Sequence, residues 1–271
     1  MISRAKTFFW NVLGMRRRLG LRTAIRLAWL FSRPYQNHDL IAVHLKGFQA
    51  PIWLRANSSD IETFLQVFAE GQYDFARFPQ QRKVWDDYRA ALGRGETPLI
   101  VDCGANIGLS ALWFANLFPK ARVVAVEPAA DNIDLMRRNL AAYPNTEIVA
   151  GGVWDKQTQL SIVDRSVMPW AYQVDQASGE RGGVQSHTIG DIAGDKPILV
   201  MKIDIEGSEA ALFRSNTEWL DRTGLLIIEL HDEKLPGRKT SRNFFQRIAK
   251  KDFEFAISGE NALFFMSGGT A

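Results

Sequence analysis

From Pro98 onward, short apolar runs alternate with helical segments, and this alternation restricts the fold more than any other feature of the chain. The runs are rich in β-branched residues and predict strands at 99–101, 122–126, 147–150, 198–205 and 225–230. Strands separated by helices require right-handed crossovers, so we expect an α/β fold with a doubly wound, mostly parallel sheet. Two further runs, 253–257 and 262–266, flank the turn 259–261 and predict a closing hairpin that adds one antiparallel strand.

The alternation begins late in the chain, and the sequence divides into three parts. Residues 1–38 form an extension with helical spacing, and residues 39–97 form a cap region with two short strands and a helix over 60–68. Residues 98–271 form the main domain. Within it, residues 155–190 are polar and rich in glycine, so we interpret this segment as an insertion or lid over the site.

Positive charge is concentrated at the N-terminus. Residues 1–38 hold eight Lys or Arg and no Asp or Glu, whereas residues 39–271 hold 25 basic and 30 acidic side chains. Because the body of the protein has no basic excess, we expect no nucleic-acid partner. Apolar residues recur at helical spacing over 3–33, between the arginines. Such a basic amphipathic helix either lies on an anionic membrane surface or packs on the main domain with solvated arginines.

The sequence also bears on the compartment. Its single cysteine, Cys103, rules out an intramolecular disulfide and fits a reducing environment. No run approaches the roughly 18 consecutive apolar residues of a membrane span. We therefore expect a cytoplasmic protein, which in the membrane-surface alternative is peripheral at the inner face of the membrane.

A glycine-containing loop follows the first strand of the main domain and reads Val101-Asp-Cys-Gly-Ala-Asn-Ile-Gly108. It lacks the Gly-Lys-Ser/Thr of a phosphate-binding loop and does not match the glycine spacing of a dinucleotide fingerprint. The carboxylate of Asp102 would repel a pyrophosphate, but it suits a ligand with a cationic end, such as the ammonium and sulfonium of S-adenosylmethionine. The predicted cofactor-binding residues in this loop are Asp102, Gly104, Ala105, Asn106 and Gly108.

A second acidic residue, Glu127, ends the next strand and is followed by Pro128. An acid at this position can accept hydrogen bonds from both hydroxyls of a ribose. Pro128 suits the start of the following helix, and Asn132 on that helix is placed to reach back to the adenosine. Glu127, Pro128 and Asn132 therefore complete the predicted cofactor site.

Charged side chains also end the next two strands of the sheet. Strand alternation places Lys202, Asp204 and Glu206 on one side of a strand end, and Glu229 and His231 end the neighbouring strand. Charged groups at the end of an apolar strand are unusual in a core and make sense at the mouth of a site. We identify Asp204, His231, Glu206 and Glu229 as candidate catalytic residues.

With these motifs in hand, the chain resembles the FkbM family of methyltransferases. The matching segments are Val-Asp-Cys-Gly-Ala-Asn-Ile-Gly (101–108), Ala-Val-Glu-Pro (125–128), Met-Lys-Ile-Asp-Ile-Glu-Gly-Ser-Glu (201–209) and Ile-Glu-Leu-His (228–231). The resemblance covers roughly residues 60–270. It implies a class I, Rossmann-like methyltransferase fold with a seven-stranded sheet and an antiparallel last strand. It also implies O-methylation of sugar hydroxyls or polyketide-type natural products, often in polysaccharide biosynthesis.

Methyl transfer to a hydroxyl requires alignment of the acceptor with the methyl group, and a general base helps. We predict that Asp204 or His231 is the base and that Glu206 and Glu229 orient it. In a competing hypothesis, which we do not favour, Mg²⁺ is held by Asp204, Glu229, His231 and Asp232. We therefore assign no metal-binding residue.

Two other classes of protein remain as alternatives at this stage. One is a nicotinamide-dependent oxidoreductase on a Rossmann-like fold, although the glycine spacing argues against it. The other is a non-catalytic membrane-surface module with a methyltransferase-like fold. We expect a small-molecule or glycan acceptor as the main partner. The sequence leaves the oligomeric state open, and a homodimer is one alternative, since small methyltransferases are often dimers.

Overall fold

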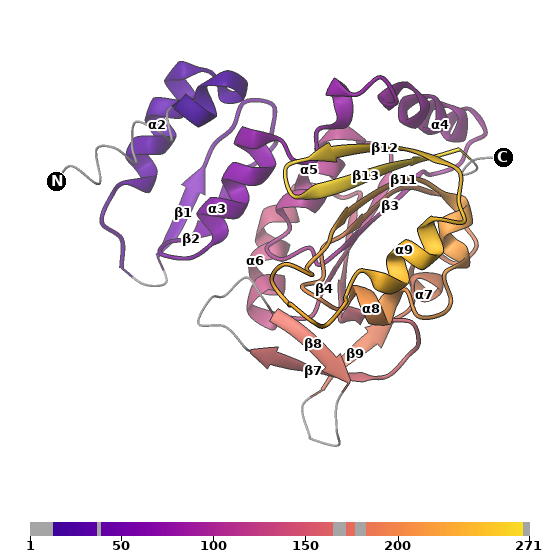
Figure 1. The fold of residues 1–271 in the computed structure, drawn as a ribbon. Helices are drawn as coiled ribbons and strands as arrows, with labels where there is room; N and C mark the ends of the chain where they lie inside the picture. Colours follow the sequence, from indigo (N-terminus) through magenta and orange to yellow (C-terminus); the bar gives the residue numbers. More distant parts are fainter. Residues whose placement is uncertain (1–12, 37–38, 165–171, 177–182, 268–271) are drawn as a thin grey trace.

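The main domain is built on a seven-stranded sheet with the order β12-β13-β11-β10-β3-β4-β5. The computed structural model describes residues 13–36, 39–164, 172–176 and 183–267 (Figure 1). The strands are β3 (Leu99–Cys103), β4 (Arg122–Glu127), β5 (Thr146–Ala150), β10 (Ile198–Ile203), β11 (Thr223–Glu229), β12 (Phe253–Ser258) and β13 (Asn261–Met266). Adjacent strands from β5 to β11 pair in parallel, and β13 is antiparallel to both of its neighbours. The doubly wound sheet with an antiparallel last strand is therefore confirmed.

Helices cover both faces of this sheet and bury two separate sets of side chains (Figure 1). They are α4 (Gln81–Gly93), α5 (Leu109–Leu117), α6 (Ala130–Leu140), α7 (Ile189–Ala193), α8 (Glu209–Leu212), the 3₁₀ turn η3 (Glu218–Arg222) and α9 (Arg242–Ile248). Because successive strand residues face opposite sides, Ile100 packs in one layer and Val101 in the other. Helix α4 was not predicted, since the range 71–96 shows no clear apolar period.

The chain before the main domain packs on it as part of the same core. It contains a helical segment at 13–19, α2 (Leu21–Phe31), β1 (Leu40–Val43), β2 (Ile52–Arg55), α3 (Asp60–Phe64), the π-helix η1 (Leu65–Glu70) and the 3₁₀ turn η2 (Phe75–Arg77). The two strands of the cap region are confirmed, and the helix predicted over 60–68 is an α-helix that continues as a π-helix. The beginning of the helical range predicted at 3–33 lies outside the described residues.

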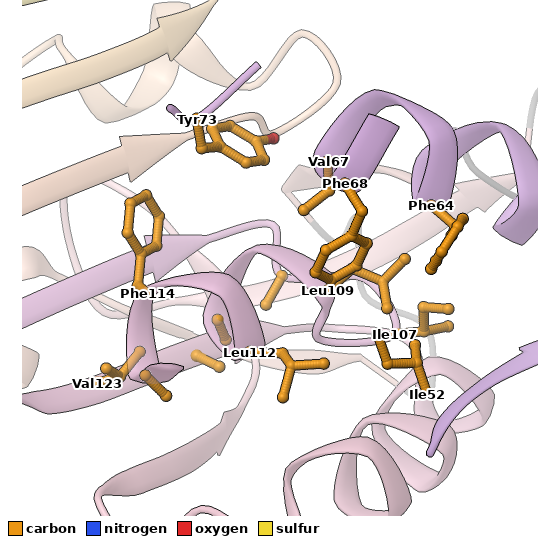
Figure 2. Packing of buried hydrophobic residues seen from close by; sticks show 14 of the residues in the cluster. Ile52, Phe64, Val67, Phe68, Tyr73, Ile107, Leu109, Leu112, Phe114 and Val123 are labelled. Carbon is orange, nitrogen blue, oxygen red and sulfur yellow. The ribbon is translucent and has the colours of Figure 1, made fainter. Parts of the chain in front are cut away.

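Aromatic side chains attach the cap region to the main domain. Figure 2 shows Phe64 and Phe68, from α3 and η1, lying near Leu109 and Ile107, with Ile52 of β2 on the same side. The rings of Phe64 and Phe68 are 5.0 Å apart, and all five side chains are buried. The cap region and the main domain therefore share one continuous core.

The segment predicted as an insertion, residues 155–190, forms a second, smaller sheet together with the two residues 152–153 before it. Its strands are β6 (Gly152–Val153), β7 (Gln159–Asp164), β8 (Tyr172–Gln176) and β9 (Val184–His187), in the order β6-β9-β7-β8. Polar composition concealed these short strands in the sequence. Thr188 and Asp191 form a capping box that begins α7 directly after β9. The role of residues 155–190 as a lid stays a prediction.

No helix in the described part of the chain is both long and apolar enough to cross a membrane.

A buried asparagine on α6 connects the cap region to the glycine loop. The side-chain oxygen of Asn139 accepts a hydrogen bond from the backbone nitrogen of Trp53 at 2.7 Å. Its amide nitrogen donates to the carbonyl oxygens of Trp53 at 3.1 Å and Ile107 at 2.9 Å. Because the side chain is 1% exposed, water cannot replace these partners.

Replacing Asn139 by Ala is expected to lower the free energy of unfolding by about 2–3 kcal/mol, because the buried carbonyl oxygen of Ile107 and two half-buried backbone groups of Trp53 lose a partner. Urea denaturation of the two proteins measures the difference. Arg137→Ala on the same helix is the matched control, since its ion pair with Asp134 is largely exposed and such pairs contribute about 0–1 kcal/mol. Equal losses in the two variants would contradict the role of Asn139.

Candidate functional site

A cavity of about 300 Å³ lies at the carboxyl ends of the central strands, where ligands bind in open α/β sheets. Its floor is formed by the loops that follow β3, β4 and β10, and Glu229 of β11 contributes one side. Two residues of β6, Gly152 and Val153, contribute another. Residues of α3 and η1 form a wall from the cap region. The cavity size is at the lower end of the range for small-molecule sites.

The glycine loop after β3 is held against the loop after β10. Gly104 has a φ of 77°, and a Cβ atom there would lie 1.8 Å from the carbonyl oxygen of Asp204. A side chain is therefore excluded by neighbouring backbone. Gly108 has a φ of 84°, and a Cβ atom there would lie 2.6 Å from the side chain of Met136 on α6. The two glycines thus permit close packing on both sides of the loop.

Glu127 joins the glycine loop to the start of α6. Its carboxylate accepts hydrogen bonds from the backbone nitrogen of Asn106 at 2.9 Å, from that of Ala129 at 3.0 Å and from the Asn132 amide at 3.1 Å. Burial raises the pKa of Glu127, and these three hydrogen bonds oppose that shift. Asn132 in turn accepts from Arg55 of β2 at 2.8 Å. The predicted contact of Glu127 with a ribose stays a prediction.

Asp102 faces into the protein and pairs with a lysine. It is fully buried, its Oδ1 lies 3.1 Å from Nζ of Lys202, and its Oδ2 accepts from the Ser110 hydroxyl. Nζ of Lys202 also donates to the carbonyl oxygen of Gly104 at 2.7 Å and lies 3.7 Å from Asp204. Burial alone would lower the pKa of Lys202, but Asp102, Tyr73 and Asp204 raise it well above its ordinary value. The ammonium is therefore charged and ties the two loops together.

Most of the predicted cofactor-binding residues line the cavity. Those that do so are Gly104, Ala105, Asn106, Glu127, Pro128 and Asn132. The other two predicted residues, Asp102 and Gly108, are not among the described residues that line the cavity. The charge of Asp102 is already balanced by Lys202, so direct contact of its carboxylate with the cationic end of a ligand stays a prediction.

The four predicted catalytic residues converge on one imidazole. Nε2 of His231 lies 3.5 Å from Asp204 and 3.4 Å from both Glu206 and Glu229. Its Nδ1 lies 2.8 Å from the fully buried carboxylate of Glu209. Glu209 belongs to the motif at 201–209, but sequence analysis assigned it no role. The structure therefore brings the predicted set together and adds a fifth member.

The carboxylates around His231 determine its protonation. Burial lowers the pKa of His231, but the hydrogen bonds that its ring donates to Glu209 and Glu229 outweigh burial and raise this pKa to about 11. At neutral pH the ring is an imidazolium, with protons on both nitrogens. A protonated ring cannot accept a further proton. The arrangement therefore disfavours His231, one of the two predicted bases, in that role.

The remaining carboxyl groups of this cluster differ in their acidity. Burial and the neighbouring charge of Asp204 raise the pKa of Glu206 to about 7. Burial also raises the pKa of Asp204, although Lys202 opposes this shift. Burial favours a higher pKa for Glu229, but hydrogen bonds from His231 and Lys234 outweigh burial and lower this pKa to about 2. Glu229 is thus a permanent anion, and Glu206 is poised to exchange a proton near neutral pH.

Backbone strain marks the same loop. Glu206 has a φ of 51°, a left-handed conformation that is unusual for a residue with a long side chain. Asn106, at the corresponding position of the loop after β3, also has a φ of 51°. Residues in this conformation cluster at functional sites. Both side chains line the cavity.

Part of this cluster has ligand atoms close enough together to hold a metal ion. Ligand atoms of Asp204, Glu206 and His231 lie within 4.8 Å of one another. Asp232, which the magnesium hypothesis included, instead accepts hydrogen bonds from the backbone of Ser241 and the hydroxyl of Thr240. Its carboxylate therefore holds the two residues that precede α9 and does not join the cluster.

Sequence analysis did not identify the wall formed by the cap region. The cap-region residues that line the cavity are Ser59, Glu62, Thr63, Gln66, Val67, Gln72 and Tyr73. They form no motif, and only the packing of α3 and η1 on the main domain brings them to the cavity. Lys202 is different, because an isolated lysine in the apolar strand 198–203, next to Asp102 in the parallel sheet, is a sequence signal for a buried ion pair.

Comparison with known proteins supports the family resemblance that the sequence motifs indicate. Residues 102–255 match the methyltransferase FkbM domain. "Methyltransferase 1" of Beauveria bassiana is 24% identical over 196 residues, which cover 62% of this chain and 72% of that protein. "Methyltransferase sdnD" of Sordaria araneosa is 35% identical over 78 residues, which cover 29% of this chain and 24% of that protein.

Among solved structures, the methyltransferase FkbM from Methylobacillus flagellatus is similar to this chain with a TM-score of 0.44 and 17% identity. The similarity covers 62% of this chain and 43% of that one, so the chain spans less than half of that protein. The domain match extends over more than half of the present sequence and contains all the candidate residues on the central strands. The chain therefore belongs to the FkbM family of S-adenosylmethionine-dependent methyltransferases.

Proposed function

We propose that this methyltransferase transfers the methyl group of S-adenosylmethionine to a hydroxyl of a sugar, a glycan or a related natural product. The observation that carries the proposal is the meeting of the glycine loop and a buried acidic cluster in one cavity. Polar side chains of the cap region, such as Thr63 and Gln66, suit an acceptor with several hydroxyl groups. Family membership decides against the nicotinamide oxidoreductase and the non-catalytic module.

The residues of the glycine loop and α6 fit the cofactor. The side-chain oxygen of Asn106 is buried and has no hydrogen-bond partner in the described part of the protein. A buried acceptor without a partner is costly, and an ammonium donor would satisfy it. We assign Asn106, Glu127 and Asn132 to binding, with the backbone of Gly104 and Ala105 approaching the ligand closely. When bound, the cofactor supplies a methyl group on a positively charged sulfur.

We assign the general base to the pair formed by Asp204 and Glu206. The acceptor oxygen forms a bond to the methyl carbon as the carbon–sulfur bond breaks, and the hydroxyl proton passes to a carboxylate of this pair. The pKa of Glu206, about 7, suits proton transfer at neutral pH. The His231 imidazolium holds both carboxylates from behind and is itself held by Glu209. In this scheme His231 is a positioning residue.

Magnesium remains the less favoured alternative. Mg²⁺ prefers an octahedral set of oxygen ligands, whereas the cluster that the structure brings together includes an imidazole nitrogen. Asp232, an oxygen ligand of the hypothesis, is engaged at the start of α9. Methyl transfer that survives exhaustive chelation would exclude this alternative.

The Glu127→Gln variant is expected to bind S-adenosylhomocysteine about 10- to 100-fold more weakly than the wild type, because the loss of one charged acceptor loosens the glycine loop. Isothermal titration calorimetry measures both affinities. Glu147→Gln is the control, since this half-exposed carboxylate on β5 pairs with Arg122 at the surface. Wild-type affinity in Glu127→Gln would remove Glu127 from the cofactor site.

Asp204→Asn is expected to lower turnover about 10²-fold or more while cofactor affinity changes only severalfold, because the amide cannot accept the proton. Steady-state kinetics with the acceptor and calorimetry with the cofactor separate the two effects. Glu233→Gln, an exposed carboxylate close in sequence, serves as the control. Unchanged turnover in Asp204→Asn would exclude Asp204 from the carboxylate pair that is proposed as the general base.

The pH dependence of kcat/KM reports the state of the base in the free enzyme. Because the pKa of Glu206 is raised to about 7, the base is protonated and inactive below this pH, and kcat/KM should rise with pH until it levels off above it. In Glu206→Gln this rise should disappear together with most of the activity. A wild-type profile that is flat between pH about 6 and 8 would contradict the assignment.

A further inference from the structure

Helix α2 presents an apolar stripe to solvent. Leu21, Ile25 and Trp29 are 56%, 46% and 58% exposed, although they are large and hydrophobic. Their spacing of four residues places them in one row along the helix. The neighbouring face buries Ala24 and Leu27 in the shared core, so the helix is held firmly while the stripe is exposed among the described residues. Three such residues in one row form a patch of the kind that marks an interaction surface.

Arginines lie beside this stripe. Arg22 and Arg26 each follow a residue of the stripe by one position, which places them in an adjacent row, and Arg26 also donates a hydrogen bond to the carbonyl oxygen of His44. The guanidinium of Arg33 lies 4.9 Å from the ring centroid of Trp29. Residues 1–38 contain no acidic side chain. The partner of this surface must therefore offer both apolar contact and negative charge.

We propose that α2 docks the protein onto the surface of an anionic lipid bilayer. A helix with an apolar row and an adjacent row of arginines lies in the plane of such a surface, with the apolar side chains at the acyl boundary and the guanidinium groups among the phosphates. Tryptophan is suited to this depth because its ring is apolar and its indole nitrogen is a donor. The helix does not cross the bilayer, since it has only 11 residues.

Docking through α2 brings the cavity wall toward the membrane. Phe31, at the end of α2, packs against Phe64 of α3 with ring centroids 5.7 Å apart. Thr63 and Gln66, beside Phe64 in sequence, line the cavity. Figure 1 shows α2 and α3 together in the part of the molecule that lies beside the main sheet. The helix that would dock thus packs directly on the element that carries this wall, whatever the acceptor is.

Co-sedimentation of the full chain with vesicles tests the proposal. One set of vesicles is pure phosphatidylcholine, and the other is about one third phosphatidylglycerol. We expect the protein to bind the anionic vesicles at least about tenfold more strongly than the neutral ones, and to lose this preference at high salt. Absence of binding to the anionic vesicles would overturn the proposal.

Two variants separate the apolar and charged contributions. Leu21→Ser/Ile25→Ser/Trp29→Ser is expected to reduce partitioning about tenfold or more, and Arg22→Gln/Arg33→Gln by a similar factor. Phe255→Ser/Ile257→Ser is the matched control, because these side chains of β12 are 53% and 64% exposed but have Glu254 beside them. We expect this control to bind vesicles as the wild type does.

The same variants exclude the other occupants of the stripe. Calorimetry with S-adenosylhomocysteine verifies that each variant is folded, so that lost partitioning is not lost structure. Light scattering during gel filtration measures the oligomeric state. Vesicle binding that is unchanged in the triple variant would overturn the proposal. A wild-type dimer that the triple variant dissociates, without any vesicle binding, would also overturn it and would assign the stripe to a second copy of the chain. Either result leaves the proposed methyl transfer untouched.

Discussion

The site depends on one buried ammonium group, that of Lys202, held between the loops that follow β3 and β10. Burying an ion pair has a large desolvation cost, which is offset only when further polar groups satisfy both charges. Here Nζ of Lys202 has Asp102 at 3.1 Å, the carbonyl oxygen of Gly104 at 2.7 Å and Asp204 at 3.7 Å. These contacts place the loop assigned to the cofactor directly beside the loop that carries the proposed base. The ion pair of Lys202 and Asp102 therefore serves to position the two loops more than to stabilise the fold. A well-packed apolar replacement of such a pair is often neutral for folding, but it would leave the two loops unconnected.

The two loops have corresponding conformations. In each, a strand of the parallel pair β3–β10 ends, and the residue three positions later adopts a φ of 51° before a helix begins. At Asn106 this conformation has a low cost, because a short polar side chain tolerates it, but at Glu206 it has a higher one. The strain at Glu206 is supported by the surrounding cluster, and the result is a carboxyl group at the cavity with its pKa raised to about 7.

The sequence was informative where a structural feature depends on local pattern. Apolar runs bounded by glycine or proline located the strands of the main sheet, and the parallel arrangement implied that acids at strand ends would meet, as Asp204, Glu206 and Glu229 do around His231. Features that depend on long-range packing could not be predicted. The inward turn of Asp102 follows from its register with Lys202, and the cavity wall at Thr63 and Gln66 follows from how the cap region packs. The small sheet β6-β9-β7-β8 was missed because its short strands are polar, although the capping box at Thr188 could have located α7.

The balance of positive and negative charges in the site supports the proposed methyl transfer to a hydroxyl. Five carboxyl groups, those of Asp102, Asp204, Glu206, Glu209 and Glu229, are in contact with three cations, Lys202, His231 and Lys234. The cations neutralise the most deeply buried carboxylates, so the residual negative charge is carried by the groups nearest the cavity. A residual negative charge attracts a sulfonium before the reaction, and it loses that attraction once the sulfur becomes a neutral thioether. The same groups hold a neutral hydroxyl acceptor by hydrogen bonds and take up its proton. One buried network can therefore favour binding of the reactants and release of the product, which supports methyl transfer to a hydroxyl over transfer to an anionic acceptor.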